Sequence, residues 1–308
     1  MRVTSEMNFR LLSDAIRRQQ VQLQQFRQQV ATGKQVAKAS DDPGAFGMIR
    51  NLSVDQAQLK QHARNADMAL QYNLTTGQGL TKAVNLMHRV NELAVQSGDG
   101  TLDDMTRGAL AENVDALLKD MLAVANGSEG GRYTFAGLRT DTPPYEAVLD
   151  PDDGRIVGVT YVGSQETRAI QIGDSLQVAT NIPGSSATSE GGIFQTATRD
   201  IFDSIIRLRD ALRSGQEVPS SDIPEQLQGD LDHLLNATSV NGAREEQIKM
   251  NKTYLLDMQA SNLKSTEALE SVDLAAAMIK LTQAENAYEA ALGSASRMLQ
   301  QVNLMNFI

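Results

Sequence analysis

The pattern of apolar and polar residues is most regular near the end of the chain. There, apolar side chains recur every three or four residues without a break, which predicts one long helix with a narrow apolar seam. Such a seam suits a coiled-coil partner, and over 32 residues it spans about 48 Å at 1.5 Å per residue. The seam residues are Leu274, Ala277, Leu281, Ala284, Tyr288, Ala291, Ala295, Met298, Val302 and Met305.

A second seam with the same spacing lies near the start of the chain. Its apolar members are Phe9, Leu12, Ile16, Leu23, Phe26 and Val30, and Gln19 is its only polar position. An isolated helix is marginally stable, so these two helices are natural partners for each other. We expect residues 1–42 and 272–308 to form a terminal coiled-coil domain whose apolar seam residues are an assembly interface. The spacing does not separate pairing between chains from an ordinary bundle within one chain.

Between the two ends, helical patterns continue. Gly33 ends the first helix, and Asp42 before Pro43 is a typical helix entry, because Pro is favoured at the first helical position after a capping Asp. Further helices are expected over about 43–96, with a bend at the glycines near 77–79, and over about 103–126, 201–212 and 224–270. Residues 43–131 and 193–271 would then form a helical rod domain.

The sequence pattern changes in the middle of the chain, where glycines and prolines separate short segments in which apolar and polar residues alternate. Strands are expected over 156–162, 168–172 and 176–180. We therefore predict a mainly α fold with a β-rich insertion, in which residues 132–192 form a small outer domain. Aromatic residues make up only 4% of the chain, which favours cores of small and aliphatic side chains.

Charge and composition exclude some classes of function. The net charge is −10, which argues against nucleic-acid binding, although residues 1–40 carry seven basic and two acidic residues. The chain has no Cys, so thiolate chemistry is excluded. No apolar run is long enough for a membrane span, and residues 1–30 lack the apolar core of a cleaved signal peptide. Any export would therefore rely on an uncleaved segment.

Residues suited to catalysis or metal binding are isolated. His62, His88 and His233 have no second ligand at a suitable spacing, and solvated helix positions explain them better than a metal site. The acidic run from Asp150 to Gly154 lacks the closing Glu of a calcium loop and is better read as a hairpin turn. We expect no catalytic, cofactor-binding or metal-binding residues, so an enzyme is the least favoured class.

Both ends of the chain resemble the flagellin family. The resemblance rests on the opening helix followed by Thr32-Gly33-Lys34, on Ala39-Ser40-Asp41-Asp42-Pro43, and on the closing segment from Val272-Asp273-Leu274-Ala275 to Leu304-Met305-Asn306-Phe307-Ile308. Within that family, the short length and the stretch from Gly131 to Tyr145 are similar to the members that join the hook to the filament.

The resemblance implies nested domains, with paired terminal helices, a helical rod and an outward β-rich part. It also implies a non-enzymatic, exported component of the bacterial flagellum that assembles with other copies of itself. The implied partners are hook-associated protein 1 on the hook side, flagellin on the filament side, and an export chaperone at the C-terminal helix. Bulk flagellin and a cytosolic helical scaffold remain alternative functions.

Overall fold

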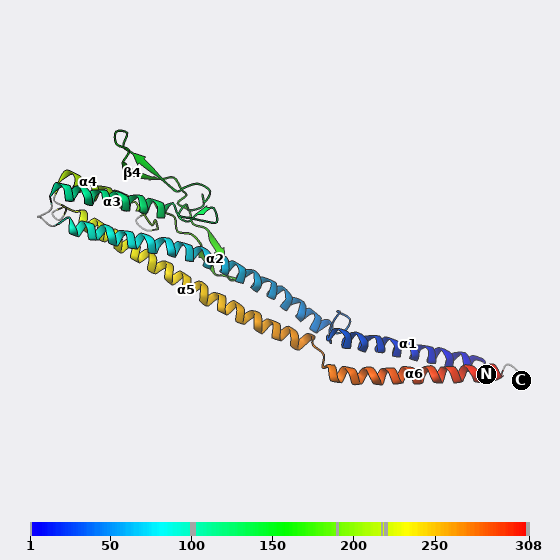
Figure 1. Ribbon diagram of the computed structural model, residues 1–308. Coiled ribbons are helices and arrows are strands. Elements are labelled where there is room, and N and C mark those ends of the chain that lie inside the picture. Colours follow the sequence, from blue (N-terminus) through cyan, green and yellow to red (C-terminus); the bar gives the residue numbers. More distant parts are fainter. Residues whose placement is uncertain (1, 99–102, 189–190, 217, 219–220, 306–308) are drawn as a thin grey trace. The chain divides into compact units, whose positions relative to one another are not determined.

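The structure is a computed structural model that describes residues 2–98, 103–188, 191–216, 218 and 221–305. Six long or medium helices carry most of the described chain (Figure 1). They are α1 (Arg2–Thr32), α2 (Pro43–Gln96), α3 (Asp104–Ala125), α4 (Ile201–Ser214), α5 (Ile223–Glu270) and α6 (Leu274–Met305). The predicted helices are therefore confirmed, and their predicted bounds agree closely with those observed.

The chain divides into two compact units. The first comprises residues 1–58 and 258–308, and the second comprises residues 59–257. Helices α2 and α5 contribute to both units. The predicted division into three domains, at residues 1–42 with 272–308, 43–131 with 193–271, and 132–192, stays a prediction.

In the first unit, α1 and α6 pack along each other (Figure 1, blue and red ribbons). The turns that lead into and out of this pair also bind each other. Gln35 N donates to Glu270 O at 2.7 Å, Val272 N donates to Gly33 O at 3.0 Å, and Lys34 forms a β-bridge with Ser271. The Thr-Gly-Lys turn after α1 is thereby tied to the turn before α6.

Two aspartates begin the helices that follow these turns. Asp42 Oδ1 accepts the backbone N–H groups of Gly44 and Ala45, both at 2.9 Å, at the start of α2. Asp273 Oδ1 accepts those of Ala275 and Ala276 at the start of α6. Each carboxylate satisfies backbone donors that have no partner within the helix. The predicted cap at Asp42 is confirmed.

In the second unit, helices and the β-rich segment together form one hydrophobic core. Although aromatic residues are scarce, five of them gather here: Phe135, Tyr145, Tyr161, Phe194 and Phe202, with neighbouring ring centroids 5.1–5.8 Å apart. They pack with buried aliphatic residues of α2, α3, α4 and α5. The core is still mainly aliphatic, as expected, but the composition did not indicate that the few aromatic rings would form one cluster.

Glycines on α2 serve this packing. A Cβ added at Gly79 would lie 2.9 Å from the ring of Phe135, and one at Gly77 would lie 3.0 Å from Asn241 Nδ2 on α5. Helix α2 runs unbroken through both positions. These glycines allow close contact between elements, which the sequence interpretation as a bend missed.

The β-rich segment consists of two-stranded antiparallel hairpins. Expected strands are found at β4 (Ile156–Tyr161), β5 (Ala169–Gln171) and β6 (Gln177–Ala179), and β5 pairs with β6. The sequence analysis missed β3 (Tyr145–Leu149), which pairs with β4, and the short pairs β1 (Ser128–Glu129) with β2 (Arg132–Tyr133) and β7 (Gln195–Thr196) with β8 (Arg199–Asp200). The mainly α fold with a small β-rich insertion is confirmed.

Two of the hairpin turns contain glycines with positive φ. Gly130 and Gly131 have φ values of 58° and 77°, as the two-residue turn between β1 and β2 requires. Asp150 N donates to Arg155 O in the β3–β4 turn, where Gly154 has φ 71°. The predicted hairpin turn at Asp150–Gly154 is confirmed.

Candidate assembly interface

The two predicted seams face each other in the first unit. Leu23 is 6% exposed and Ala277 is 2% exposed, and both lie on the facing sides of α1 and α6. The other described seam residues are half-buried, namely Leu12, Ile16, Phe26, Val30, Leu281, Ala284, Tyr288, Ala291 and Ala295. Leu274, at the first turn of α6, is exposed. The side chains of Phe9, Met298, Val302 and Met305 lie outside the described residues.

Gln19, the polar position in the α1 seam, is also half-buried. An ion pair joins the same two helices, since Arg27 Nη2 lies 3.1 Å from Glu285 Oε1. Both side chains are largely exposed, so this pair contributes little to stability. Apolar contact along the seam, together with the bonded turns at Gln35 and Val272, is what holds α1 against α6.

A second group of apolar side chains on these two helices points away from the seam. Ile279 is 61% exposed, Met278 58%, Leu11 58%, Val21 59% and Leu292 44%. Two paired helices bury only one stripe each, so these side chains remain in contact with water. These side chains are candidates for contact with another protein.

The sequence analysis did not include this second group in the assembly interface. Its members interrupt the spacing of three and four, so a search for one seam passes over them. A helix with apolar residues on more than one face is the signal that would have found them, because such a helix needs more than one partner.

The described residues give no support to a metal site, since they contain no group of three His, Asp or Glu side chains that could hold an ion. The histidines are nevertheless less solvated than predicted. His62 Nε2 lies 3.4 Å from Asp174 Oδ1, and His233 Nε2 lies 2.8 Å from Gly192 O. Only His88 of the three is exposed. The prediction of solvated positions was wrong for His62 and His233, because both are half-buried beside these groups.

One buried ion pair stands out in the second unit. Arg209 donates from Nη1 to Asp115 Oδ1 at 3.0 Å and to Ile156 O at 2.7 Å. Burial alone would raise the pKa of Asp115, but hydrogen bonds from Lys119 and Arg209 outweigh it and the pKa is lowered. The pair connects α3, α4 and β4, which suits a structural role.

No described helix is both long and apolar enough to cross a membrane.

Known proteins agree with this architecture. Residues 4–140 match the family of the bacterial flagellin N-terminal helical region. The chain is 31% identical to flagellar hook-associated protein 3 of Salmonella typhimurium over 55% of this chain and 54% of that protein. It is 22% identical to flagellin of Listeria monocytogenes over 91% of this chain and 88% of that protein. The chain thus spans about half the length of the Salmonella relative.

A solved structure shows the same fold. Flagellar hook-associated protein 3 from Legionella pneumophila matches with a TM-score of 0.59 at 18% identity, covering 72% of this chain and 99% of that chain. The fold is therefore that of a mainly helical protein whose terminal helices pair and leave apolar side chains exposed. Over residues 4–140, which is less than half of its length, the chain resembles the bacterial flagellin N-terminal helical region.

Proposed function

We propose that this chain is a structural subunit of the bacterial flagellum that joins the hook to the flagellin filament by helical subunit assembly. The proposal rests on the exposed apolar side chains of α1 and α6, which the other described residues leave uncovered. The likeness to flagellar hook-associated protein 3 supports the position at the junction.

The physical requirement for partners follows from the α1–α6 pair. Burying a side chain such as Ile279 or Met278 against another helix contributes about 1.5–3 kcal/mol. Repeated along both helices, this favours contacts with other copies of the chain. At the two faces of the assembled layer, hook-associated protein 1 and flagellin would supply the equivalent contacts. Such a role requires no catalysis.

Before assembly, the same surface would expose the chain to aggregation. We propose that a flagellar export chaperone covers the C-terminal helix until the chain leaves the cell. Export would proceed through the flagellar type III apparatus without cleavage of a signal peptide, which gives the protein an extracellular location on the flagellum.

Bulk flagellin is the second candidate, because the likeness to Listeria flagellin extends over most of the chain. A filament subunit would be present along the whole filament, whereas a junction subunit would occupy only its base. A cytosolic scaffold, the third candidate, would not be found on flagella at all.

A strain that lacks this chain tests the proposal. It should build hooks without filaments and release unpolymerised flagellin into the medium, because the filament would have no surface on which to begin. Electron microscopy of the cells and antibody detection of flagellin in the medium measure both effects. Filaments of normal length and number on such cells would overturn the proposal.

A further inference from the structure

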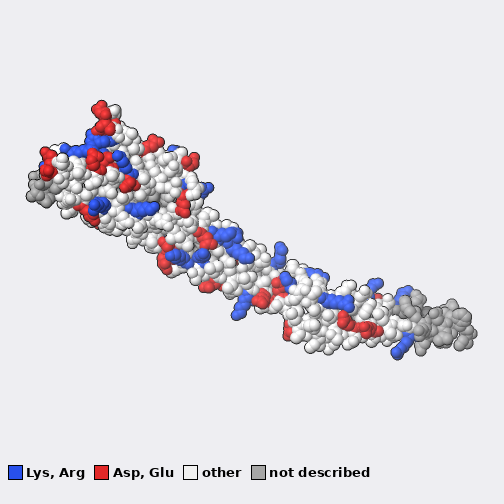
Figure 2. All heavy atoms as spheres, viewed as in Figure 1, with Lys and Arg blue, Asp and Glu red and all other residues white. Residues whose placement is uncertain are grey.

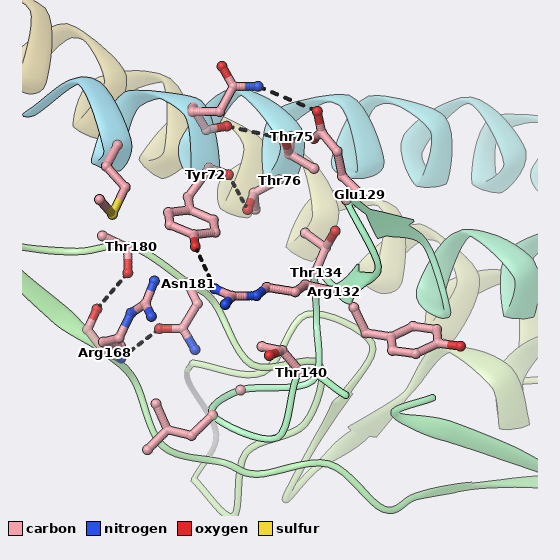
Figure 3. Close-up of a pocket in the computed structure, with 16 residues that line it drawn as sticks. Tyr72, Thr75, Thr76, Glu129, Arg132, Thr134, Thr140, Arg168, Thr180 and Asn181 are labelled. Carbon is pink, nitrogen blue, oxygen red and sulfur yellow. Dashed lines mark hydrogen bonds between the residues drawn. The ribbon is translucent and has the colours of Figure 1, made fainter. Parts of the chain in front are cut away.

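The second unit contains a cavity of about 540 Å³ between α2 and the β-rich segment (Figure 3). Three side chains dominate its chemistry: Tyr72 on α2, Arg132 on β2 and Arg168 just before β5. Arg132 Nη1 donates to Tyr72 Oη at 3.3 Å, and the Arg168 guanidinium lies 5.0 Å from the centre of the Tyr72 ring. We call this cavity the basic pocket.

The two guanidinium groups form no ion pair with a carboxylate of the described residues. Among the ion pairs of the described residues, none includes Arg132 or Arg168. Glu129 also lines the pocket, but its carboxylate accepts hydrogen bonds from Gln71 and Thr75 on α2. In a chain with a net charge of −10, two positive groups held on one tyrosine favour an anionic partner.

The lining of the pocket also indicates the shape of that partner. Met68 is 50% exposed and Leu138 is 47% exposed, and both line the cavity. Apolar side chains beside two guanidinium groups suit a peptide segment that carries carboxylates next to aliphatic residues. A small inorganic anion would leave Met68 and Leu138 uncovered.

The β3–β4 hairpin carries such a segment. Leu149 is 57% exposed, Val148 48% and Val157 47%. Beyond them, the turn presents Asp150, Asp152 and Asp153, and Asp153 pairs with Arg155. Asp152 has no ion pair among the described residues. Figure 2 shows acidic atoms gathered at the tip of this projecting hairpin.

The chain does not place its own hairpin tip in its own pocket. The residues that line the pocket come from α2, from positions 129–140, and from Arg168, Thr180 and Asn181, with none from β3 or β4. Both surfaces are therefore available to a second copy.

We propose that the tip of the β3–β4 hairpin in one copy docks into the basic pocket of a neighbouring copy. Asp152 would face Arg132 and Arg168, while Leu149 and Val148 would cover Met68 and Leu138. Because the two surfaces differ, the contact is head-to-tail, and repetition gives a ring or a helix of subunits. The inference rests on the proposed function, since only an assembled protein brings copies into this register.

Cross-linking between engineered cysteines tests the contact directly, because the chain has none of its own. Leu149→Cys and Leu138→Cys variants would be produced in the same cells, and their flagella isolated and treated with a short bis-maleimide. We expect a cross-linked dimer only when both variants are present. A matched control pairs Leu138→Cys with Asp232→Cys, an exposed acidic position on α5, and should give no dimer.

Charge exchange then tests the chemistry. Arg168→Glu in the Leu138→Cys copy should lower the dimer yield more than about tenfold, because like charges would face each other. Adding Asp152→Arg to the Leu149→Cys copy should restore most of the yield, which a merely structural role for Arg168 would not allow. Asp152→Arg alone, in an exposed turn, should also reduce the yield. If Arg168→Glu prevents folding, the Asp152→Arg variant still tests the contact, because its substitution lies in an exposed turn.

The outcomes separate this inference from the proposed function. If antibody detects the chain on flagella but the Leu149→Cys and Leu138→Cys pair gives no dimer, the hairpin contact is wrong and the junction role stands. A yield that does not respond to either charge change overturns the pairing of Asp152 with the pocket. Absence of the chain from flagella overturns both.

Discussion

Single residues far apart in the sequence connect the elements of the second unit. Arg209 is the clearest case, since its side chain is 2% exposed and it binds Asp115 on α3 and the backbone of β4. No local pattern announces this contact, because Asp115 and Arg209 are 94 positions apart. Asn73 and Asn241 behave alike, each donating from its side-chain amide to the backbone oxygen of the other.

Replacing Arg209 should therefore lower the free energy of unfolding more than replacing an arginine of a surface ion pair. Arg209→Met would leave Asp115 buried with only Lys119 as a partner, and the free energy of unfolding should fall by about 3–5 kcal/mol. Arg213→Met, whose partner Glu112 is exposed, is the matched control and should cost less than about 1 kcal/mol. Urea unfolding measures both values. Equal, small losses would show that the buried pair does not hold the helices together.

The close packing of Gly79 against Phe135 predicts that a larger side chain at position 79 destabilises the protein. Gly79→Ala would push a methyl group against the ring of Phe135, which is 1% exposed and held by Phe194, and should destabilise the protein by about 1–3 kcal/mol. Gly242→Ala, in α5 with open space around its Cβ, should instead stabilise it by up to about 1 kcal/mol. Thermal unfolding of both variants compares them. A stabilised Gly79→Ala would contradict the packing described for Phe135.

At the scale of whole elements, the sequence was a good guide wherever the pattern was long and periodic. The helices over 43–96 and 274–305 follow from apolar spacing, and the first also from the cap at Asp42; both are local signals. Strand β3 was missed because Tyr145–Leu149 is short and lies beside two prolines. The outward apolar side chains of α1 and α6 were missed because one apolar seam was enough to predict each helix. Which other side chains remain exposed depends on how the two helices pack against each other.

An exposed apolar residue of helix α6, Ile279, allows the assembly interface to be tested. Ile279→Asp places a charge on a side chain that is exposed in the single chain, so folding and export should be unchanged. In the assembled layer, the same charge would be buried against a neighbour at a cost of several kcal/mol, and filaments should fail to form. Counting filaments by electron microscopy and detecting the variant in the medium test this.

The control for Ile279→Asp is Glu289→Gln, an exposed change on the same helix, which should leave the cells motile. Leu281→Asp is less informative, because Leu281 is half-buried within the α1–α6 seam and its replacement would also loosen the pairing. Normal filaments on Ile279→Asp cells would remove the outward face of α6 from the assembly interface.

At the scale of the whole molecule, the proposed function places the chain at the junction between hook and filament. The fold is that of a solved hook-associated protein, and in the proposed assembly the exposed apolar side chains of α1 and α6 would contact neighbouring subunits. Junction subunit and bulk filament subunit share all of these features. They differ in where along the flagellum the subunits lie.

Immunogold labelling of isolated hook–filament structures therefore tests the account most directly. Antibody against this chain should label one narrow band where the hook meets the filament, and hooks isolated from cells lacking the chain should show no label. Label along the entire filament would identify the chain as flagellin, and label absent from flagella but present in the cytoplasm would contradict the account altogether.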